Sequence, residues 1–114
     1  MVPTSDFSLW KKIQKEKYNQ REEVRKVYLT SLISRLRAYF YQLHPDSVYL
    51  TGSILQEGHF YDFSDVDIAV KGLKGNYFKV LSDLEEITGR EVDLIEMEKC
   101  RFSQNIETRG LRIV

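Results

Sequence analysis

Two aspartates inside an aliphatic run constrain this chain more than any other feature of its sequence. From Ser64 to Val70, aliphatic residues alternate with two aspartates and an alanine, with Val66, Ile68 and Val70 in one set and Asp65, Asp67 and Ala69 in the other. This period of two predicts a β-strand with both carboxylates on one face. Two neighbouring like charges repel each other, and a divalent cation bound by carboxylate oxygens offsets that repulsion. The pattern predicts a metal site; the alternative is a pair of solvent-facing aspartates on an edge strand.

A Gly-Ser turn follows a second short predicted strand. In Ser47–Thr51 the aliphatic residues Val48 and Leu50 share one face, which predicts a strand ending at the turn. Gly52 lets the backbone turn sharply and lets a ligand approach it closely. Ser53 offers an N–H group and a hydroxyl, and a helical turn starting here presents further N–H groups to an anion. The turn therefore predicts a phosphate site close to the acid pair.

A third carboxylate lies in a later run of the same kind. Asp93 is set among aliphatic residues in the predicted strand 91–96. Binding of a nucleotide together with a metal is the interpretation that uses the acid pair, the Gly-Ser turn and this third acid. The alternative for Asp93 is a surface aspartate in a strand.

The order and spacing of these motifs resemble the DNA polymerase β-like nucleotidyltransferase superfamily. The short chain is similar to its minimal nucleotidyltransferase (MNT) family, and the similarity runs from Val48 to the closing segment 106–111 and the C-terminus. The spacer after the Gly-Ser turn departs from the common form, because it carries Glu57 and Asp62 where relatives often carry arginines. The resemblance implies catalytic metal ligands and nucleotide-binding residues, namely Asp65, Asp67 and Asp93 in the first group and Gly52, Ser53 and Ser64 in the second.

The resemblance also implies an activity and a partner. Relatives use Mg²⁺, with two ions expected here, and ATP as the substrate. In the MNT family the partner is commonly a small helical HEPN protein, and such pairs resemble toxin–antitoxin modules in which AMP is transferred to a tyrosine of the toxin. The expected function is therefore that of an antitoxin with protein adenylyltransferase activity. Two alternatives are a binding module that inhibits its partner by contact, against which the retained Asp93 argues, and transfer to a small molecule or RNA.

Length and composition limit the other possibilities. At 114 residues the chain is expected to form a single domain, too short to add a dedicated substrate domain. It contains no Walker A pattern, no dinucleotide fingerprint and no Cys/His spacing typical of zinc sites. The one cysteine, Cys100, excludes an internal disulfide, and neither a signal pattern nor a membrane-spanning run is present, so a cytoplasmic protein is expected.

The N-terminal part predicts a long helix from Asp6 to about Leu43. An apolar stripe at spacings of three and four is expected to pack on the sheet, with Val27 beside it; its members are Val24, Tyr28, Leu32, Leu36, Phe40 and Leu43. A separate short stripe contains Phe7, Trp10 and Ile13. A continuous helix of this length spans roughly 55 Å, so it either breaks near Asn19-Gln20 or projects from the domain.

The projecting alternative predicts an arm at residues 1–22 and a core at residues 23–114. The arm is expected to dock either a second copy of the chain or the helical partner. Residues 1–44 hold nine basic and four acidic residues, so 9 − 4 = +5, whereas residues 45–114 hold eight and thirteen, so 8 − 13 = −5. The basic half is suited to an acidic partner or to nucleic acid, and the alternative is an ordinary solvated helix surface.

The remaining elements complete a small α/β (α+β) fold. A helix is expected after the N-cap Asn76, with Phe78, Leu81, Leu84 and Ile87 on one face and Gly89 as its stop. A short helix marked by Phe102 and Ile106 ends at Gly110, and Leu111 and Ile113 are expected in a last strand. The loop aromatics Phe60, Tyr61 and Phe63 either stack on a base or pack the loop. The expected architecture is a small mixed sheet with helices on one face, as in the polymerase β-like fold.

Overall fold

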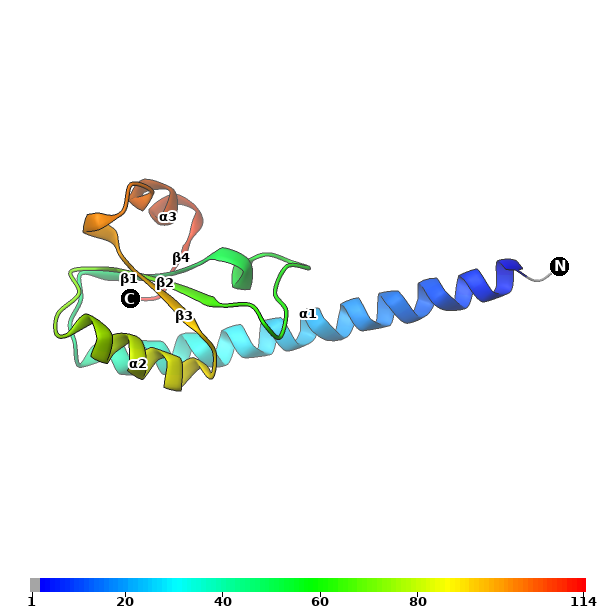
Figure 1. Cartoon of the computed structure of the whole chain (residues 1–114), viewed down its shortest axis with the longest axis horizontal. Coiled ribbons are helices and arrows are strands. Elements are labelled where there is room, and N and C mark those ends of the chain that lie inside the picture. Colours follow the sequence, from blue (N-terminus) through cyan, green and yellow to red (C-terminus); the bar gives the residue numbers. More distant parts are fainter. Residues whose placement is uncertain (1–2) are drawn as a thin grey trace.

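A computed structural model of the chain describes residues 3–114, with side chains from Phe7 onward (Figure 1). The elements in chain order are α1 (Pro3–Tyr41), β1 (Ser47–Thr51), the 3-10 turn η1 (Gly52–Leu55), β2 (Val66–Lys71), α2 (Tyr77–Thr88), β3 (Val92–Glu96), the 3-10 turn η2 (Met97–Lys99), α3 (Ser103–Arg109) and β4 (Leu111–Arg112). The predicted α/β fold with a long N-terminal helix is confirmed. In the part of the chain that the structure describes, no helix has both the length and the apolar character needed to cross a membrane.

The four strands form one mixed sheet in the order β3-β2-β1-β4. β1 lies antiparallel to both β2 and β4, whereas β2 and β3 run parallel. The parallel pair is connected by α2, as a parallel crossover requires. This arrangement puts β2 in the interior of the sheet, so the strand that carries Asp67 is not an edge strand.

The hydrophobic core lies between the sheet and the two longer helices. It contains side chains from α1, α2 and three strands, among them Leu32, Leu36, Phe40, Val48, Leu50, Val66, Ile68, Val70, Val80 and Leu84. A smaller cluster on the opposite face of the sheet joins Tyr49 and Ala69 to Met97 and Ile106. The two longer helices therefore cover one face as expected, and the short α3 adds cover on the other face (Figure 1).

The ends of α2 were predicted correctly, but its buried face is rotated from the one expected. The Asn76 side chain accepts hydrogen bonds from the N–H groups of residues 78 and 79, at 2.9 and 3.1 Å, and Gly89 ends the helix in the left-handed conformation. Val80 and Leu84 are buried, whereas Phe78 is 75% exposed. Phe78 lies beyond the edge of the buried helical stripe, because Tyr77 and Val80 are the residues of the first turn that face the sheet.

The long helix α1 is continuous and does not break at Asn19-Gln20. Its residues 7–17 are all exposed, and contact with the rest of the chain begins at Tyr18, whose hydroxyl donates to Glu57 at 2.8 Å. The molecule is consequently 66 Å long but only 27 Å and 19 Å across its other axes. Figure 1 shows the N-terminal half of α1 extending away from the sheet.

The expectation that Val24 and Val27 face the sheet is wrong. They are 62% and 60% exposed, while Glu22 and Arg25 are the buried residues at this level of α1. The reason is that α1 packs here against a loop rather than against the sheet. A loop backbone presents unpaired N–H and C=O groups, and a buried charged pair can satisfy them where aliphatic side chains cannot.

Candidate active site at the β2–β3 sheet edge

The structure brings together the three predicted carboxylates. Asp67 on β2 is the direct register partner of Asp93 on the parallel strand β3. Neighbouring strands lie roughly 4.8 Å apart, and register partners project from the same face of a sheet. Asp65 lies one residue before β2, on the same side as Asp67 by the two-residue period. Asp67 is partly buried, whereas Asp65 and Asp93 are exposed.

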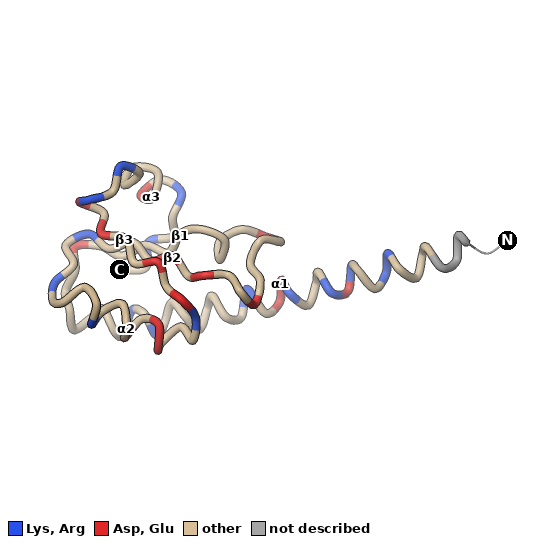
Figure 2. The backbone as a smooth tube through the Cα atoms, viewed as in Figure 1, with Lys and Arg blue, Asp and Glu red and all other residues tan. Residues whose placement is uncertain are grey.

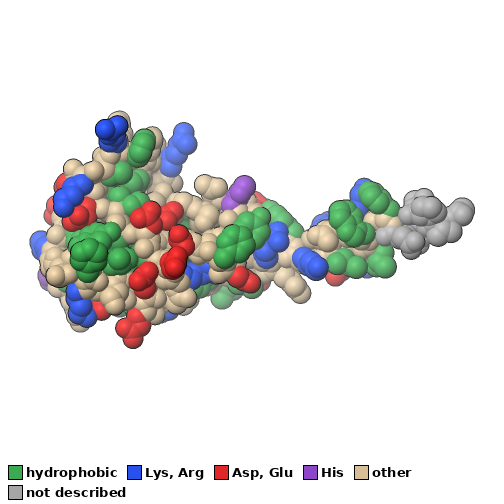
Figure 3. All heavy atoms as spheres, in the orientation of Figure 1, with side chains coloured by type: hydrophobic (Ala, Val, Ile, Leu, Met, Phe, Trp, Pro, Cys, Tyr) green, Lys and Arg blue, Asp and Glu red, His purple; other side chains and the backbone are tan. Residues whose placement is uncertain are grey.

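The clustered carboxylates disturb the titration of Asp67. Burial, and after it the nearby charges of Asp93 and Asp65, together raise its pKa from 3.8 to about 6. Figure 2 shows acidic residues gathered along β2 and β3, and Figure 3 shows them exposed together on one face. The site is therefore a concentration of negative charge that the protein itself does not neutralise.

The donor set fits a divalent cation that arrives with a nucleotide. Within the residues described here, no group of three or more His, Cys, Asp or Glu side chains converges into a ready-made metal cage. Mg²⁺ does not need such a cage, because it commonly keeps several waters and binds one or two carboxylates together with substrate phosphates. The carboxylate oxygens of Asp65, Asp67 and Asp93 are ligands of the kind Mg²⁺ takes, and a cation relieves the repulsion at Asp67.

The Gly-Ser turn lies against the same carboxylates. Thr51, the last residue of β1, is the register partner of Asp67. Gly52 follows in the left-handed region with φ of 82°, and a Cβ atom at this position would collide with the Asp67 carboxylate. Ser53 is the second residue of the 3-10 turn η1 and is partly exposed. The sequence thus anticipated both the turn and its proximity to the acids, while the roles of Gly52 and Ser53 in phosphate binding stay predictions.

The turn is held in place by α1, a contact that sequence reasoning missed. The Arg25 Nη1 donates to the carbonyl of Ile54 at 3.0 Å, and the N–H of Gly58 donates to Glu22 Oε2 at 3.0 Å. Glu22 and Arg25 also pair with each other at 3.0 Å, and both are buried. In the sequence, two charged residues one helical turn apart indicate only an ordinary ion pair on a helix surface. Ile54 lies 29 positions after Arg25, and Gly58 lies 36 positions after Glu22, so the sequence does not indicate these contacts.

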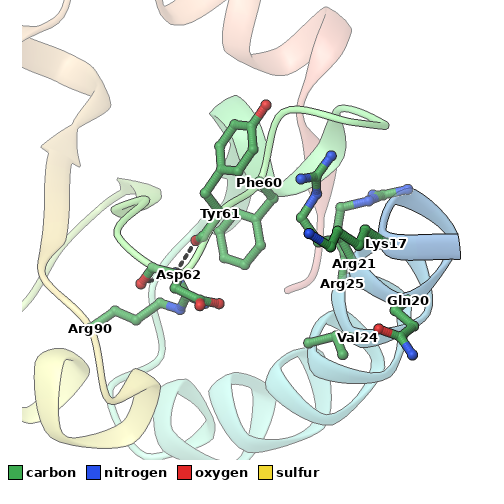
Figure 4. Close-up of a pocket in the computed structure, with 9 residues that line it drawn as sticks. All are labelled: Lys17, Gln20, Arg21, Val24, Arg25, Phe60, Tyr61, Asp62 and Arg90. Carbon is green, nitrogen blue, oxygen red and sulfur yellow. Dashed lines mark hydrogen bonds between the residues drawn. The ribbon is translucent and has the colours of Figure 1, made fainter. Parts of the chain in front are cut away.

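A second anchor, Arg90, holds the loop that leads into the acid pair. Its Nη1 donates to the carbonyls of Tyr61, Asp62 and Ser64 at 2.7, 3.2 and 2.9 Å. The guanidinium also lies over the ring of Phe60, 4.2 Å from the centroid. Figure 4 shows Arg90 reaching the backbone at Tyr61 and Asp62. The spacer itself contains no arginine, and Arg90 reaches it from the turn before β3.

The loop is a closed turn whose last residue precedes Asp65. The Ser64 N–H donates to the Tyr61 carbonyl at 3.1 Å, and the Ser64 Oγ accepts from the Tyr61 N–H at 2.9 Å. Ser64 therefore has a structural part in this turn, and its predicted contact with nucleotide stays a prediction. Because the turn ends directly before Asp65, its conformation determines where the acid pair begins.

We expect Arg90→Ala to loosen this turn. Hydrogen bonds from a charged donor contribute more than neutral ones, so the free energy of unfolding should fall by roughly 2 kcal/mol. Hydrogen–deuterium exchange should become faster at the amides of Tyr61 and Ser64, and Arg90→Lys should restore protection only in part, because an ammonium cannot reproduce the planar guanidinium stacking. The matched control is Arg35→Ala, which removes an exposed arginine that donates to the Ile87 carbonyl rather than to a carbonyl of the loop. Unchanged exchange in the Arg90→Ala loop would contradict the anchoring role.

A cavity of about 370 Å³ lies between α1 and this loop (Figure 4). Its lining is rich in cationic and aromatic side chains, including Lys17, Arg21, Arg25, Phe60, Tyr61 and Arg90. Phe60 is buried and stacks on Tyr28, which confirms packing for that ring, whereas Tyr61 and Phe63 stack on each other and are exposed. None of the three aspartates lines the cavity, so it adjoins the candidate active site and does not contain it.

The comparison with known families places these features in context. Residues 34–114, well over half of the chain, match the family model described as "Polymerase beta, Nucleotidyltransferase". The match includes the Gly-Ser turn and all three aspartates, and it begins within α1. A search of curated proteins found no match.

Proposed function

The chain belongs to the polymerase beta nucleotidyltransferase family, and from this premise we propose that it transfers AMP from ATP to a hydroxyl group of a partner protein. Pyrophosphate is the second product. The observation that carries the proposal is that Asp67 has Asp93 as its register partner and lies against Gly52. Three motifs that are separate in the sequence meet at one end of the sheet, where β1 ends and β2 and β3 begin, with the ligands for a cation next to the turn for phosphates.

Each group in the proposed site has its own task. Asp65 and Asp67 would hold two Mg²⁺ ions, with Asp93 as a further ligand, and the N–H groups after Gly52, together with the Ser53 hydroxyl, would bind the terminal phosphates. Bound Mg²⁺ supplies neutralisation of the charge that develops on the phosphate oxygens. Asp93 orients the acceptor hydroxyl and helps to remove its proton. Positioning and electrostatic stabilisation provide the catalysis, and no covalent enzyme intermediate is needed.

The proposed acceptor is a tyrosine of a helical HEPN-type partner, which makes this chain an antitoxin. What supports an external acceptor is that the described residues form one sheet with its helices and include no separate acceptor-binding unit. The three carboxylates are exposed or partly buried at the surface, where a second protein can reach them.

The test follows the fate of the nucleotide. The purified chain is incubated with Mg²⁺ and with ATP labelled at either the α- or the γ-phosphate, with and without proteins that co-purify with it. Transfer of AMP predicts that the α-label, and not the γ-label, becomes attached to a partner protein, and that EDTA prevents it. Label in RNA or in a small molecule would overturn the protein acceptor. Inhibition of the partner with no transfer of label would identify a binding module instead.

A further inference from the structure

One side of α1 carries apolar side chains that nothing else in the described chain covers. Trp10, Ile13, Val24 and Val27 are between 41% and 62% exposed. Isolated exposed apolar residues are ordinary on protein surfaces, but exposed apolar residues that cluster along one side of an element mark an interaction surface. Figure 3 shows hydrophobic side chains at the surface of the part of α1 that extends from the domain.

These residues follow the spacing of a coiled-coil seam. With two polar residues between them they alternate at intervals of three and four, and we call the set Trp10, Ile13, Lys17, Gln20, Val24 and Val27 the exposed stripe. At about 100° per residue, the exposed stripe is turned roughly 140° away from the row of α1 residues that packs into the core. The helix therefore presents one face to its own domain and a second face to another helix.

A hollow on the exposed stripe has the shape that helix packing needs. A depression of about 400 Å³ is lined by residues that include Val24, Val27, Tyr28 and Ser31. Positions i, i+3, i+4 and i+7 form the four-residue hole that receives a side chain from a facing helix in knobs-into-holes packing. The hollow has almost entirely apolar walls, and so suits a large apolar side chain such as Trp10.

We propose that the exposed stripe binds the exposed stripe of a second copy of this chain, with the two α1 helices antiparallel. In this arrangement Trp10 of each copy faces Val27 of the other, Ile13 faces Val24, and Lys17 faces Gln20. Apolar residues meet apolar residues at both ends, and the two polar pairs meet in the middle. The order apolar–polar–apolar is thus complementary to itself, as a two-fold interface requires.

Charge also favours a second copy in this direction. A parallel pair would place Lys17 against Lys17 in the seam, whereas the antiparallel pair places it against the neutral Gln20. The other lysines of this segment, Lys11, Lys12, Lys15 and Lys26, are turned more than about 100° away from the stripe, so the two copies do not oppose these charges. The sheet packs against the opposite side of α1, and the loop at residues 60–62 flanks one side of the stripe next to Lys17, Gln20 and Val24. The 18-residue overlap is about 27 Å long, which predicts a small interface.

The proposal is tested by the mass of the full-length chain in sedimentation equilibrium over a wide range of concentration. The wild-type protein should approach twice the monomer mass as its concentration rises, and Val24→Glu should remain monomeric with an unchanged circular dichroism spectrum. Phe78→Glu is the matched control, because it places the same charge at an equally exposed apolar residue on α2. A wild-type monomer at every concentration, or a dimer that survives Val24→Glu, would overturn the proposal.

A pair of charges tests the antiparallel register. The double variant Ile13→Glu with Val24→Lys places Glu opposite Lys at both ends of the proposed seam, and it should dimerise again although each single variant does not. In a parallel dimer the same residues would face their own kind and repel. Failure of the double variant to dimerise would overturn the antiparallel arrangement.

Discussion

We expect Asp67→Asn to lose nucleotidyl transfer by roughly 10³-fold or more, since a ligand charge at a catalytic metal is worth several kcal/mol. Asp67 is central to the site because it is the register partner of Asp93 and lies against Gly52. Asparagine has nearly the same shape, so the substitution removes a charge and leaves the packing of β2 in place. The measurement is the rate at which labelled AMP is attached to the acceptor. Full activity in this variant would refute the assignment of Asp67.

The stability of the same variant provides an independent readout. Burial and the neighbouring acids raise the pKa of Asp67 to about 6 in the folded protein, so protonation stabilises the fold. That stability is fully present below about pH 4 and is lost as the pH rises through about 6. The full pKa shift of Asp67 is worth about 3 kcal/mol, and solvent screening reduces that value because the side chain is only partly buried. At about pH 7.5 without metal, Asp67→Asn should therefore be more stable than the wild type by about 1–2 kcal/mol.

Thermal unfolding in EDTA measures this difference, which should shrink as the pH falls and should vanish below about pH 4, where Asp67 becomes protonated in both states. Glu86→Gln is the control, because it neutralises an exposed carboxylate on α2 away from the acids. An Asp67→Asn protein that gains no stability at neutral pH would show that the acid cluster does not destabilise the fold.

Gly52→Ala should weaken ATP binding and destabilise the protein. The left-handed backbone at Gly52, with φ of 82°, costs a residue with a Cβ roughly 1–2 kcal/mol. The added methyl group would also displace the Asp67 carboxylate, which has no room to remain where it is. Titration calorimetry with ATP and Mg²⁺ should show at least a tenfold weaker affinity, equivalent to about 1.4 kcal/mol.

Gly75→Ala separates backbone strain from the collision with Asp67. Gly75 has a similar φ of 93°, but a Cβ there would meet nothing within 4 Å. This control should lose stability to a similar backbone strain and keep the wild-type affinity for ATP. Equal ATP affinities in wild type and Gly52→Ala would show that the turn is not the phosphate site.

The sequence alone was sufficient to predict the structural features that depend on residues close together in the chain. The period of two in β2 placed Asp65 and Asp67 apart from the aliphatic residues, and Asn76 and Gly89 ended α2 as their local hydrogen bonding and backbone conformation require. The three aspartates and the Gly-Ser turn were found for the same reason. Their types and order carry the chemistry, and the fold then placed Asp67, Asp93 and Gly52 together.

Only the tertiary structure decided which surfaces of the helices are buried and what holds the loop. The apolar pattern of α1 contains two rows, and Val24 could not be assigned to the solvent-facing row until the position of the loop was known. Arg25 donates to a carbonyl 29 residues away in the sequence. Arg90 donates to three carbonyls that lie between 26 and 29 residues away. Backbone groups accept hydrogen bonds at every residue, so a sequence does not indicate which carbonyl a distant arginine will reach. That choice is made when the helices and the sheet pack against each other.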